Sequence, residues 1–291
     1  MSSLKISLLC LGFVFTACNS SSRSAEKNPI IKKTDTSNRT CIPESELLAT
    51  DIIGGQVVQQ SDTDSKVVVM LVSGSQPDAH MCTSVVIGKK VILTAAHCIV
   101  GTKMNTYVSF HSSISCESGY NKNIHIKGVK ETIVNEEYDP ASKPEDMIGD
   151  IALVILEEEI PEGYQIFNIA DPDQLDSSDE MYLYGYGITG SNLKDAGLLR
   201  KTILSRTQYE VMAESKKIKI DQSAGTGICK GDSGGPSFIK NTKGEMQIIG
   251  INSYVVGPDA DICSKNSFQT LAHSYKAWID SKLSAINKNK K

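Results

Sequence analysis

Residues 230–236 read Lys-Gly-Asp-Ser-Gly-Gly-Pro and place Ser233 in a glycine-rich turn. A serine hydroxyl is a weak nucleophile, and it needs a neighbouring base and donors for the oxyanion that develops during the reaction. The glycines allow the backbone to turn so that several N–H groups point at one spot. Taken alone, this motif is more often an ordinary turn, so a base and a carboxylate must be sought elsewhere in the sequence.

Two other segments supply such groups. His97 follows the apolar run 91–93 and stands among small residues that let a substrate approach. Asp150 comes directly before the apolar run 151–156. A lone histidine of this kind is more often structural, and a lone aspartate is more often the cap of a strand. Together with Ser233, however, the two provide a nucleophile, a general base and a carboxylate that orients the base.

The hydrophobic pattern along the chain predicts strands. Short apolar runs recur between turn clusters such as Gly88-Lys89-Lys90 and Asn241-Thr242-Lys243-Gly244. The clearest runs are residues 67–72, 85–87, 91–93, 151–156 and 247–251. Many short strands without alternating helices indicate an antiparallel sandwich or barrel. Residues 274–286 have instead the apolar spacing of a helix.

Three motifs, TAAHC (residues 94–98), DIAL (150–153) and GDSGGP (231–236), occur in the order His, Asp, Ser. In this order and spacing, the sequence from residue 52 to the C-terminus resembles the trypsin and chymotrypsin family. The resemblance implies an all-β fold of two packed six-stranded antiparallel Greek-key barrels, with the site in the cleft between them and a C-terminal helix. It also implies a serine endopeptidase that acts on proteins or peptides.

The resemblance assigns a role to each of the motif residues. Ser233 attacks the scissile carbonyl, His97 takes its proton and gives it to the leaving amine, and Asp150 holds the imidazole. The backbone N–H groups of Gly231 and Ser233 form the oxyanion hole. Ser253 supports Asp150, and the segment that contains it pairs with the backbone of the substrate.

Six cysteines follow the N-terminal segment, and their number alone permits fifteen pairings. The resemblance implies two disulfides, one beside the catalytic histidine and one across the specificity pocket. These are Cys82–Cys98 and Cys229–Cys263. Cys41 and Cys116 then remain, and their pairing, which would tether the segment before the protease domain, stays open.

Residues 52–55, Ile-Ile-Gly-Gly, resemble the activation site of the same family. A cut between Asp51 and Ile52 would free an α-amino group that can be buried against Asp232. This pairing would order the loop that contains Gly231 and Ser233, the oxyanion loop. His80 matches the family position that holds the equivalent of Asp232 before activation. Asp51 departs from the usual Arg or Lys, so the expected activating protease has a specificity other than tryptic.

The residues of the specificity pocket argue against a basic side chain in the substrate. Gly227 stands where trypsin-like members have Asp, so no carboxylate compensates the desolvation of Arg or Lys. Val255 narrows the wall of the pocket, as in elastase-like members, and predicts small or medium aliphatic residues on the acyl side. Asp259 and Asp261 in the adjoining loop are an alternative source of basic specificity. The predicted substrate-binding residues are Gly227, Ile228, Lys230, Ser253, Tyr254 and Val255.

The N-terminal residues have the pattern of an export signal. Lys5, the apolar run 6–15 and the small residues Thr16 and Ala17 predict a signal peptide over residues 1–17. Residues 15–18, Phe-Thr-Ala-Cys, also resemble the lipobox of bacterial lipoproteins, in which Cys18 would be lipidated. We therefore expect an exported protein, either secreted or lipid-anchored at a bacterial cell envelope. Residues 18–51 are polar and predict a linker or propeptide before a protease domain over residues 52–291.

Composition limits the classes of partner. A formal net charge of −4 and a pI near 5.8 give no electrostatic footprint for nucleic acid. No pair of cysteines has CxxC spacing, and no counterpart of the family's acidic calcium loop is found near Glu117. We therefore expect neither a metal nor a cofactor.

Two alternatives from other classes stay open. The chain could be a protease-fold binding protein without turnover, or a cell-surface lipoprotein that uses the fold as a scaffold. Binding proteins of this fold usually lack a triad residue, whereas all three are present in this sequence. A covalent serine-hydrolase probe distinguishes the enzyme from both alternatives.

Overall fold

The computed structural model describes residues 52–73, 80–100, 106–113, 126–175, 178–193 and 195–288. These residues belong to one compact unit, Ser37–Lys291. The expected signal peptide and linker, with Cys18, Cys41, Asp51 and Cys116, lie outside the described residues and remain predictions. Within the described ranges, no helix is long and apolar enough to cross a membrane.

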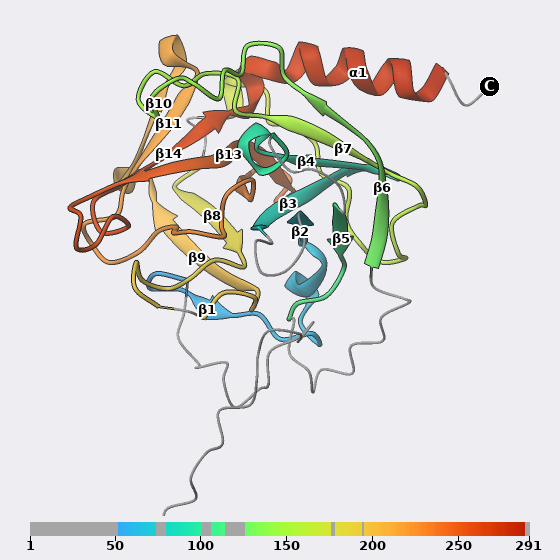
Figure 1. The fold of residues 1–291 in the computed structure, drawn as a ribbon. Coiled ribbons are helices and arrows are strands. Elements are labelled where there is room, and N and C mark those ends of the chain that lie inside the picture. The colour runs from blue at the N-terminus through green and yellow to red at the C-terminus, as the bar shows by residue number, and fades with distance from the viewer. Residues whose placement is uncertain are drawn as a thin grey trace, which may run out of the picture. The chain divides into compact units, whose positions relative to one another are not determined.

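Six strands close into an antiparallel barrel in the order β2-β3-β4-β7-β6-β5 (Figure 1). The strands are β2 (Val68–Ser73), β3 (His80–Gly88), β4 (Val91–Thr94), β5 (Tyr107–Ser109), β6 (Ile126–Val134) and β7 (Ala152–Leu156). Every residue of β4 and β7 is buried, which explains why these two strands are continuous apolar runs in the sequence.

Eight further strands form a second antiparallel sheet in the order β1-β9-β8-β12-β13-β14-β11-β10. The strands are β1 (Gln56–Val57), β8 (Glu180–Gly185), β9 (Arg200–Ser205), β10 (Tyr209–Met212), β11 (Lys217–Asp221), β12 (Pro236–Lys240), β13 (Met246–Val256) and β14 (Asn266–Leu271). The expected all-β fold of two packed barrels is confirmed. In detail, only the first sheet closes. The second is a half-barrel in which short β1 and β10 extend a set of six longer strands.

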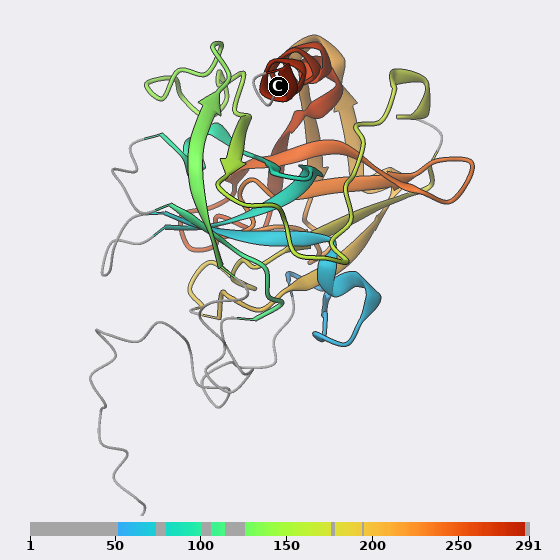
Figure 2. The same ribbon diagram turned by 90° about the vertical axis from the view of Figure 1, so that its right-hand side faces the viewer.

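One α-helix, α1 (Lys276–Lys288), follows the last strand and confirms the helix predicted over residues 274–286. It is seen nearly end-on at the top of Figure 2. Its residue Ile279 is buried in the core, and its residues Trp278, Leu283 and Ile286 are partly buried against the same core. The 3₁₀ helices of the described residues are η2 (Thr63–Lys66), η3 (Ala96–Cys98), η4 (Pro172–Gln174), η5 (Arg206–Gln208), η6 (Ala213–Ser215) and η7 (Ala272–Tyr275).

The largest apolar cluster joins the two sheets. It contains the interior of the closed barrel and also Tyr186, Phe238 and Ile251 from the second sheet and its loops. The rings of Phe167 and Phe238 lie 4.7 Å apart, and the Tyr186 hydroxyl donates a hydrogen bond to the His111 carbonyl at 2.8 Å. The loops at the boundary between the sheets are therefore held by a common core.

Candidate active site

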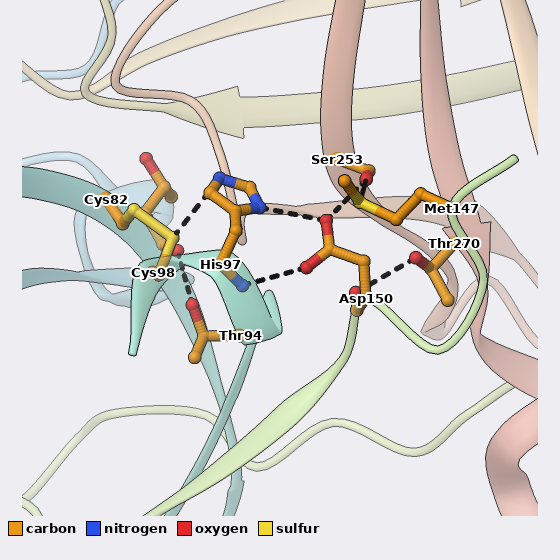
Figure 3. A network of polar contacts seen from close by, with 9 residues as sticks. Cys82, Thr94, His97, Cys98, Met147, Asp150, Ser253 and Thr270 are labelled. Atoms are coloured by element: carbon orange, nitrogen blue, oxygen red, sulfur yellow. Dashed lines mark hydrogen bonds and ion pairs between the residues drawn. A yellow bond between two sulfur atoms is a disulfide. The ribbon is translucent and has the colours of Figure 1, made fainter. Parts of the chain in front are cut away.

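Strand pairing brings His97 and Asp150 together. β4 and β7 are neighbours, and Thr94 at the end of β4 lies opposite Ala152 at the start of β7. His97, three residues after Thr94, therefore emerges at the same edge of the barrel as Asp150, two residues before Ala152. Asp150 Oδ2 lies 2.8 Å from His97 Nδ1, and Oδ1 accepts a hydrogen bond from the His97 backbone N–H at 2.9 Å (Figure 3).

The Asp150 carboxylate is buried and ionised. Its residue is 1% exposed, and the Ser253 hydroxyl donates a short hydrogen bond to Oδ2. Burial, the largest single influence, would raise the pKa of Asp150. Hydrogen bonds from His97 and Ser253 and the charge of His97 outweigh it, so the pKa lies below its usual value. An ionised carboxylate at Nδ1 fixes the tautomer in which Nδ1 carries the proton and Nε2 is free to accept one.

Ser253 reaches Asp150 because β13 contains a bulge. The register between β13 and β14 shifts between Asn252 and Tyr254, so Ser253 is the extra residue. Such a bulge turns a side chain out of the regular alternation of the strand. The next residue, Tyr254, stacks on Phe268 with 4.8 Å between ring centroids. The structure thus brings together three predicted residues from separate parts of the chain.

Later parts of the chain support the loop before β7. The Thr270 hydroxyl donates a hydrogen bond to the Asp150 carbonyl at 2.9 Å, and the Gly149 N–H donates one to the Tyr275 hydroxyl at 2.7 Å. Gly149 has a φ of +67°, and a Cβ there would lie 2.8 Å from the Tyr138 nitrogen. Sequence reasoning did not identify Thr270 or Tyr275 as supports for the candidate site.

Ser233 lies in the turn before β12 and shares a cavity of about 550 Å³ with His97 and Gly231. Gly231 and Gly234 on either side of it have φ values of +97° and +77°, a conformation that glycine adopts readily. Among the described residues, no hydrogen bond of the Ser233 hydroxyl is found, and His97 Nε2 lies 3.8 Å from Cys98 Sγ. The structure therefore places the predicted nucleophile and base in one cavity without a direct bond between them.

Both disulfides implied by the sequence are present, Cys82–Cys98 and Cys229–Cys263. Cys82 and Cys98 join β3 to η3, and both line the cavity of about 550 Å³. The Sγ atoms of these two cysteines and the ring of His97 lie close together, as in some metal sites. Because both sulfurs are in the disulfide, they are not available as thiolate ligands.

Asp232, the residue expected to pair with a freed N-terminus, is fully buried. Its carboxylate accepts hydrogen bonds from the Gly187 N–H at 2.8 Å and the Cys229 N–H at 2.9 Å. Burial raises the pKa of Asp232 to about 7, although these bonds and the charge of Arg200 work in the opposite direction. Within the described part of the chain, no cation lies at ion-pair distance from this carboxylate.

The segment that begins at Ile52 lies beside the loop of Asp232. Ile52 is fully buried, and the Ile53 carbonyl accepts a hydrogen bond from the Gly227 N–H at 3.0 Å. Ile53 also packs against the apolar cluster that contains Cys229. The residue after the predicted new N-terminus thus contacts the stretch 227–229, which leads to Asp232.

The residues predicted for the specificity pocket are held by a side chain that sequence reasoning missed. The Gln222 amide accepts a hydrogen bond from the Ile228 N–H at 2.7 Å and donates to the carbonyls of Ile228 and Cys263. A Cβ on Gly227 would lie 2.2 Å from Gln222 Oε1, so this amide requires glycine there. A buried glutamine after a strand is a weak signal in a sequence, because nothing local marks its bonds to Ile228 and its other partner, Cys263, lies 41 residues further along the chain.

The remaining residues of the predicted pocket differ in exposure. Val255 is partly buried and packs against the apolar clusters on both sides of it. Lys230 is exposed. Asp261, the alternative source of basic specificity, is exposed and accepts a hydrogen bond from the Ser191 hydroxyl at 2.5 Å.

The fold and the geometry of this site define a two-sheet β protein of the chymotrypsin-like serine protease class. The family model described as Trypsin matches residues 52–279, so the chain belongs to the trypsin family. Its relatives include Venom serine protease 34 of Apis mellifera, 30% identical over 68% of this chain and 51% of that protein.

Two further relatives are similar to this chain at lower identity. Coagulation factor XI of Bos taurus is 27% identical over 72% of this chain. Chymotrypsin-like elastase family member 1 of Canis lupus familiaris is 24% identical over 79% of this chain and 91% of that protein. The chain spans about half of the venom protease and 34% of factor XI.

Proposed function

We propose that this chain is a serine endopeptidase that hydrolyses peptide bonds with Ser233, His97 and Asp150. The observation that carries the proposal is the contact of 2.8 Å between buried Asp150 and partly exposed His97, whose ring lines the cavity that also contains Ser233. A structural histidine would not need an ionised, buried carboxylate at Nδ1 and a serine of the GDSGGP motif in the same cavity.

In this mechanism His97 Nε2 takes the proton of the Ser233 hydroxyl as the oxygen attacks the scissile carbonyl carbon. The negative charge that develops on the carbonyl oxygen is stabilised by the backbone N–H groups of Gly231 and Ser233. His97 then gives its proton to the leaving amine, and a water molecule hydrolyses the acyl-enzyme by the same steps in reverse. Asp150 remains ionised throughout and stabilises the imidazolium.

The enzyme is proposed to be made as a zymogen that is cut between Asp51 and Ile52. The new α-amino group of Ile52 would supply the cation that the buried Asp232 carboxylate lacks among the described residues. Such a pair contributes little to stability in general, but it can fix one conformation of a loop. Because the bond follows Asp51, the activating protease has a specificity other than tryptic.

The proposed substrates carry small or medium aliphatic residues on the acyl side of the cut. The pocket residues Gly227, Ile228 and Val255 offer no charge, and Gln222 has both ends of its amide engaged. A buried Arg or Lys side chain would therefore lose its hydration without compensation. Export by residues 1–17, with a lipid on Cys18 as the proposed tether to a bacterial envelope, would place this activity outside the cell.

A fluorophosphonate probe, which bonds covalently to an activated serine, tests the proposal. Full-length protein and protein processed to begin at Ile52 are treated in parallel, with Ser233→Ala as the control. We expect labelling of the processed form, weak labelling of the full-length form and none of the variant. Equal labelling of both forms would contradict the zymogen. The absence of labelling in either form, with the fold intact, would contradict the enzyme and favour a binding protein.

A further inference from the structure

We propose that Thr83 is a positioning residue that holds the oxyanion loop from the opposite barrel. The inference rests on the proposed function, because it assigns a partner to the loop that contains Gly231 and Ser233. Thr83 lies in β3 of the closed barrel, directly after Cys82, and is fully buried. Neither the sequence motifs nor the triad assigns it a role.

The Thr83 hydroxyl connects two loops of the second sheet, the one after β8 and the one before β12. It donates a hydrogen bond to the Gly231 carbonyl at 3.0 Å and accepts one from the Tyr186 N–H at 3.0 Å. The Thr83 backbone N–H donates a third bond, to the Ser233 carbonyl, at 2.8 Å. One residue of the first barrel thus bonds to both residues that would form the oxyanion hole.

These bonds close a ring with those of Asp232. The N–H groups of Tyr186 and Gly187 are consecutive, and they bond to the Thr83 hydroxyl and the Asp232 carboxylate respectively. The Thr83 hydroxyl returns to the carbonyl of Gly231, the residue before Asp232. A peptide unit held at both ends of such a ring cannot rotate unless a bond breaks.

The ring acts on the oxyanion donor through Gly231. The N–H and the carbonyl of this glycine are separated only by its φ and ψ, and its φ of +97° lies in a region that other residues avoid. The Gly231 carbonyl shares a peptide unit with the Asp232 N–H, which donates a hydrogen bond to the Cys229 carbonyl at 3.1 Å. If the Thr83 bond is lost, only this second bond restrains the unit, and the Gly231 N–H gains freedom to turn away from the position of the oxyanion. Thr83 therefore contributes to transition-state stabilisation without touching the substrate.

Close packing leaves the loop little freedom to compensate. A Cβ on Gly234 would lie 2.6 Å from the Thr83 carbonyl oxygen, and one on Gly235 would lie 2.9 Å from Thr83 Cγ2. The same carbonyl accepts a hydrogen bond from the Thr94 hydroxyl at 3.3 Å, at the end of the strand that leads to His97. Thr83 thus lies between the nucleophile loop and the strand of the base.

The test compares Thr83→Val, which keeps the shape and removes the hydroxyl, with Thr83→Ser, which restores the hydroxyl. Ser84→Ala is the matched control, because Ser84 is the next residue of β3, is fully buried and has no hydrogen-bond partner for its hydroxyl within the described residues. If Thr83→Val does not yield folded protein, Thr83→Ala takes its place. The protein is used full-length and after processing to begin at Ile52.

For Thr83→Val we expect kcat to fall about 10- to 100-fold, less than the loss of a whole oxyanion donor, with KM within about twofold. Thr83→Ser should recover most of kcat, and Ser84→Ala should equal the unmodified protein. Hydrogen exchange at the Tyr186 N–H should accelerate in Thr83→Val alone. An unchanged kcat in Thr83→Val, or an equal loss in Ser84→Ala, would overturn the inference. Absence of turnover and labelling in the unmodified protein would overturn the proposed function instead.

Discussion

The two halves of the candidate site are held in place by different means. His97 and Asp150 flank paired strands of a closed barrel, so the register of β4 and β7 brings them together. Ser233 lies in a glycine-rich turn. In this turn the Gly231 carbonyl accepts a hydrogen bond from buried Thr83, and the buried Asp232 carboxylate accepts bonds from two backbone N–H groups. The base is thus positioned by strand pairing, whereas the nucleophile and its oxyanion hole depend on a few buried polar bonds.

The largest effect is expected from a change in the half that strand pairing holds. Asp150→Asn removes the charge and reverses the preferred tautomer of His97, while the barrel around it stays paired. We expect kcat to fall by about 10⁴-fold, as in comparable triads, with the circular dichroism spectrum unchanged. Asp173→Asn, at an exposed aspartate, is the control and should leave kcat unaltered. A loss of less than tenfold would show that Asp150 does not orient the catalytic base.

The other half should respond to pH through Asp232. Burial raises the pKa of this carboxyl to about 7 in the folded protein, whereas an unfolded aspartate has a pKa of about 4. Between these values the unfolded chain binds fewer protons than the folded chain. The stability of the full-length protein should therefore fall as pH rises through this window, by a few kcal/mol at most on the order-of-magnitude scale of such shifts.

Denaturant unfolding at pH 5 and pH 8 measures this difference for the full-length protein and for Asp232→Asn. The asparagine variant should lose the part of the pH dependence that belongs to Asp232. Processing at Ile52 should reduce it as well, because a nearby ammonium group favours the ionised carboxylate. Identical pH dependence in the protein and the variant would mean that Asp232 does not titrate in this window.

The smallest effect is expected in the specificity pocket, where we expect the side chain of Val255 to decide between small and large acyl-side residues. Val255→Gly removes the bulk of the predicted wall and should shift kcat/KM toward larger acyl-side residues by about tenfold, the scale of a few methylene groups. The neighbouring Val256 is 43% exposed, so Val256→Gly is the matched control and should leave the ratio unchanged. Peptides that differ only in Ala, Val, Leu or Phe at this position provide the measurement. A ratio that changes equally in both variants would argue against Val255 as the wall.

The same contrast explains how much could be predicted from the sequence. The fold, the C-terminal helix and the placement of His97 and Asp150 follow from short motifs beside apolar runs, because local pattern and strand register carry that information. The bonds of Thr83 do not, because its hydroxyl reaches Gly231 across 148 residues and the motif around it has no distinguishing feature. The amide of Gln222 and the bulge at Ser253 were missed for the same reason, since tertiary contacts define them.

The closed and open sheets also differ in what the sequence revealed. Apolar runs marked β4 and β7, which are buried along their whole length. The two-residue strand β1 and the short β10 at the edges of the second sheet have no such run. The family resemblance implied six strands for this half, whereas the described residues form eight. Edge strands gain their definition from their neighbours rather than from their own hydrophobicity.

The supports of the Asp150 loop have a consequence for the order in which the protein is made. Thr270 and Tyr275 hold Asp150 and Gly149 from positions 120 and 126 residues further along the chain. Ribosomes make the N-terminal residues first, so a nascent chain contains His97 and Asp150 well before the donor Thr270 and the acceptor Tyr275 emerge. The loop of the orienting carboxylate is completed only after residues 270–275 have left the ribosome, which delays assembly of the site until long after His97 and Asp150 have emerged.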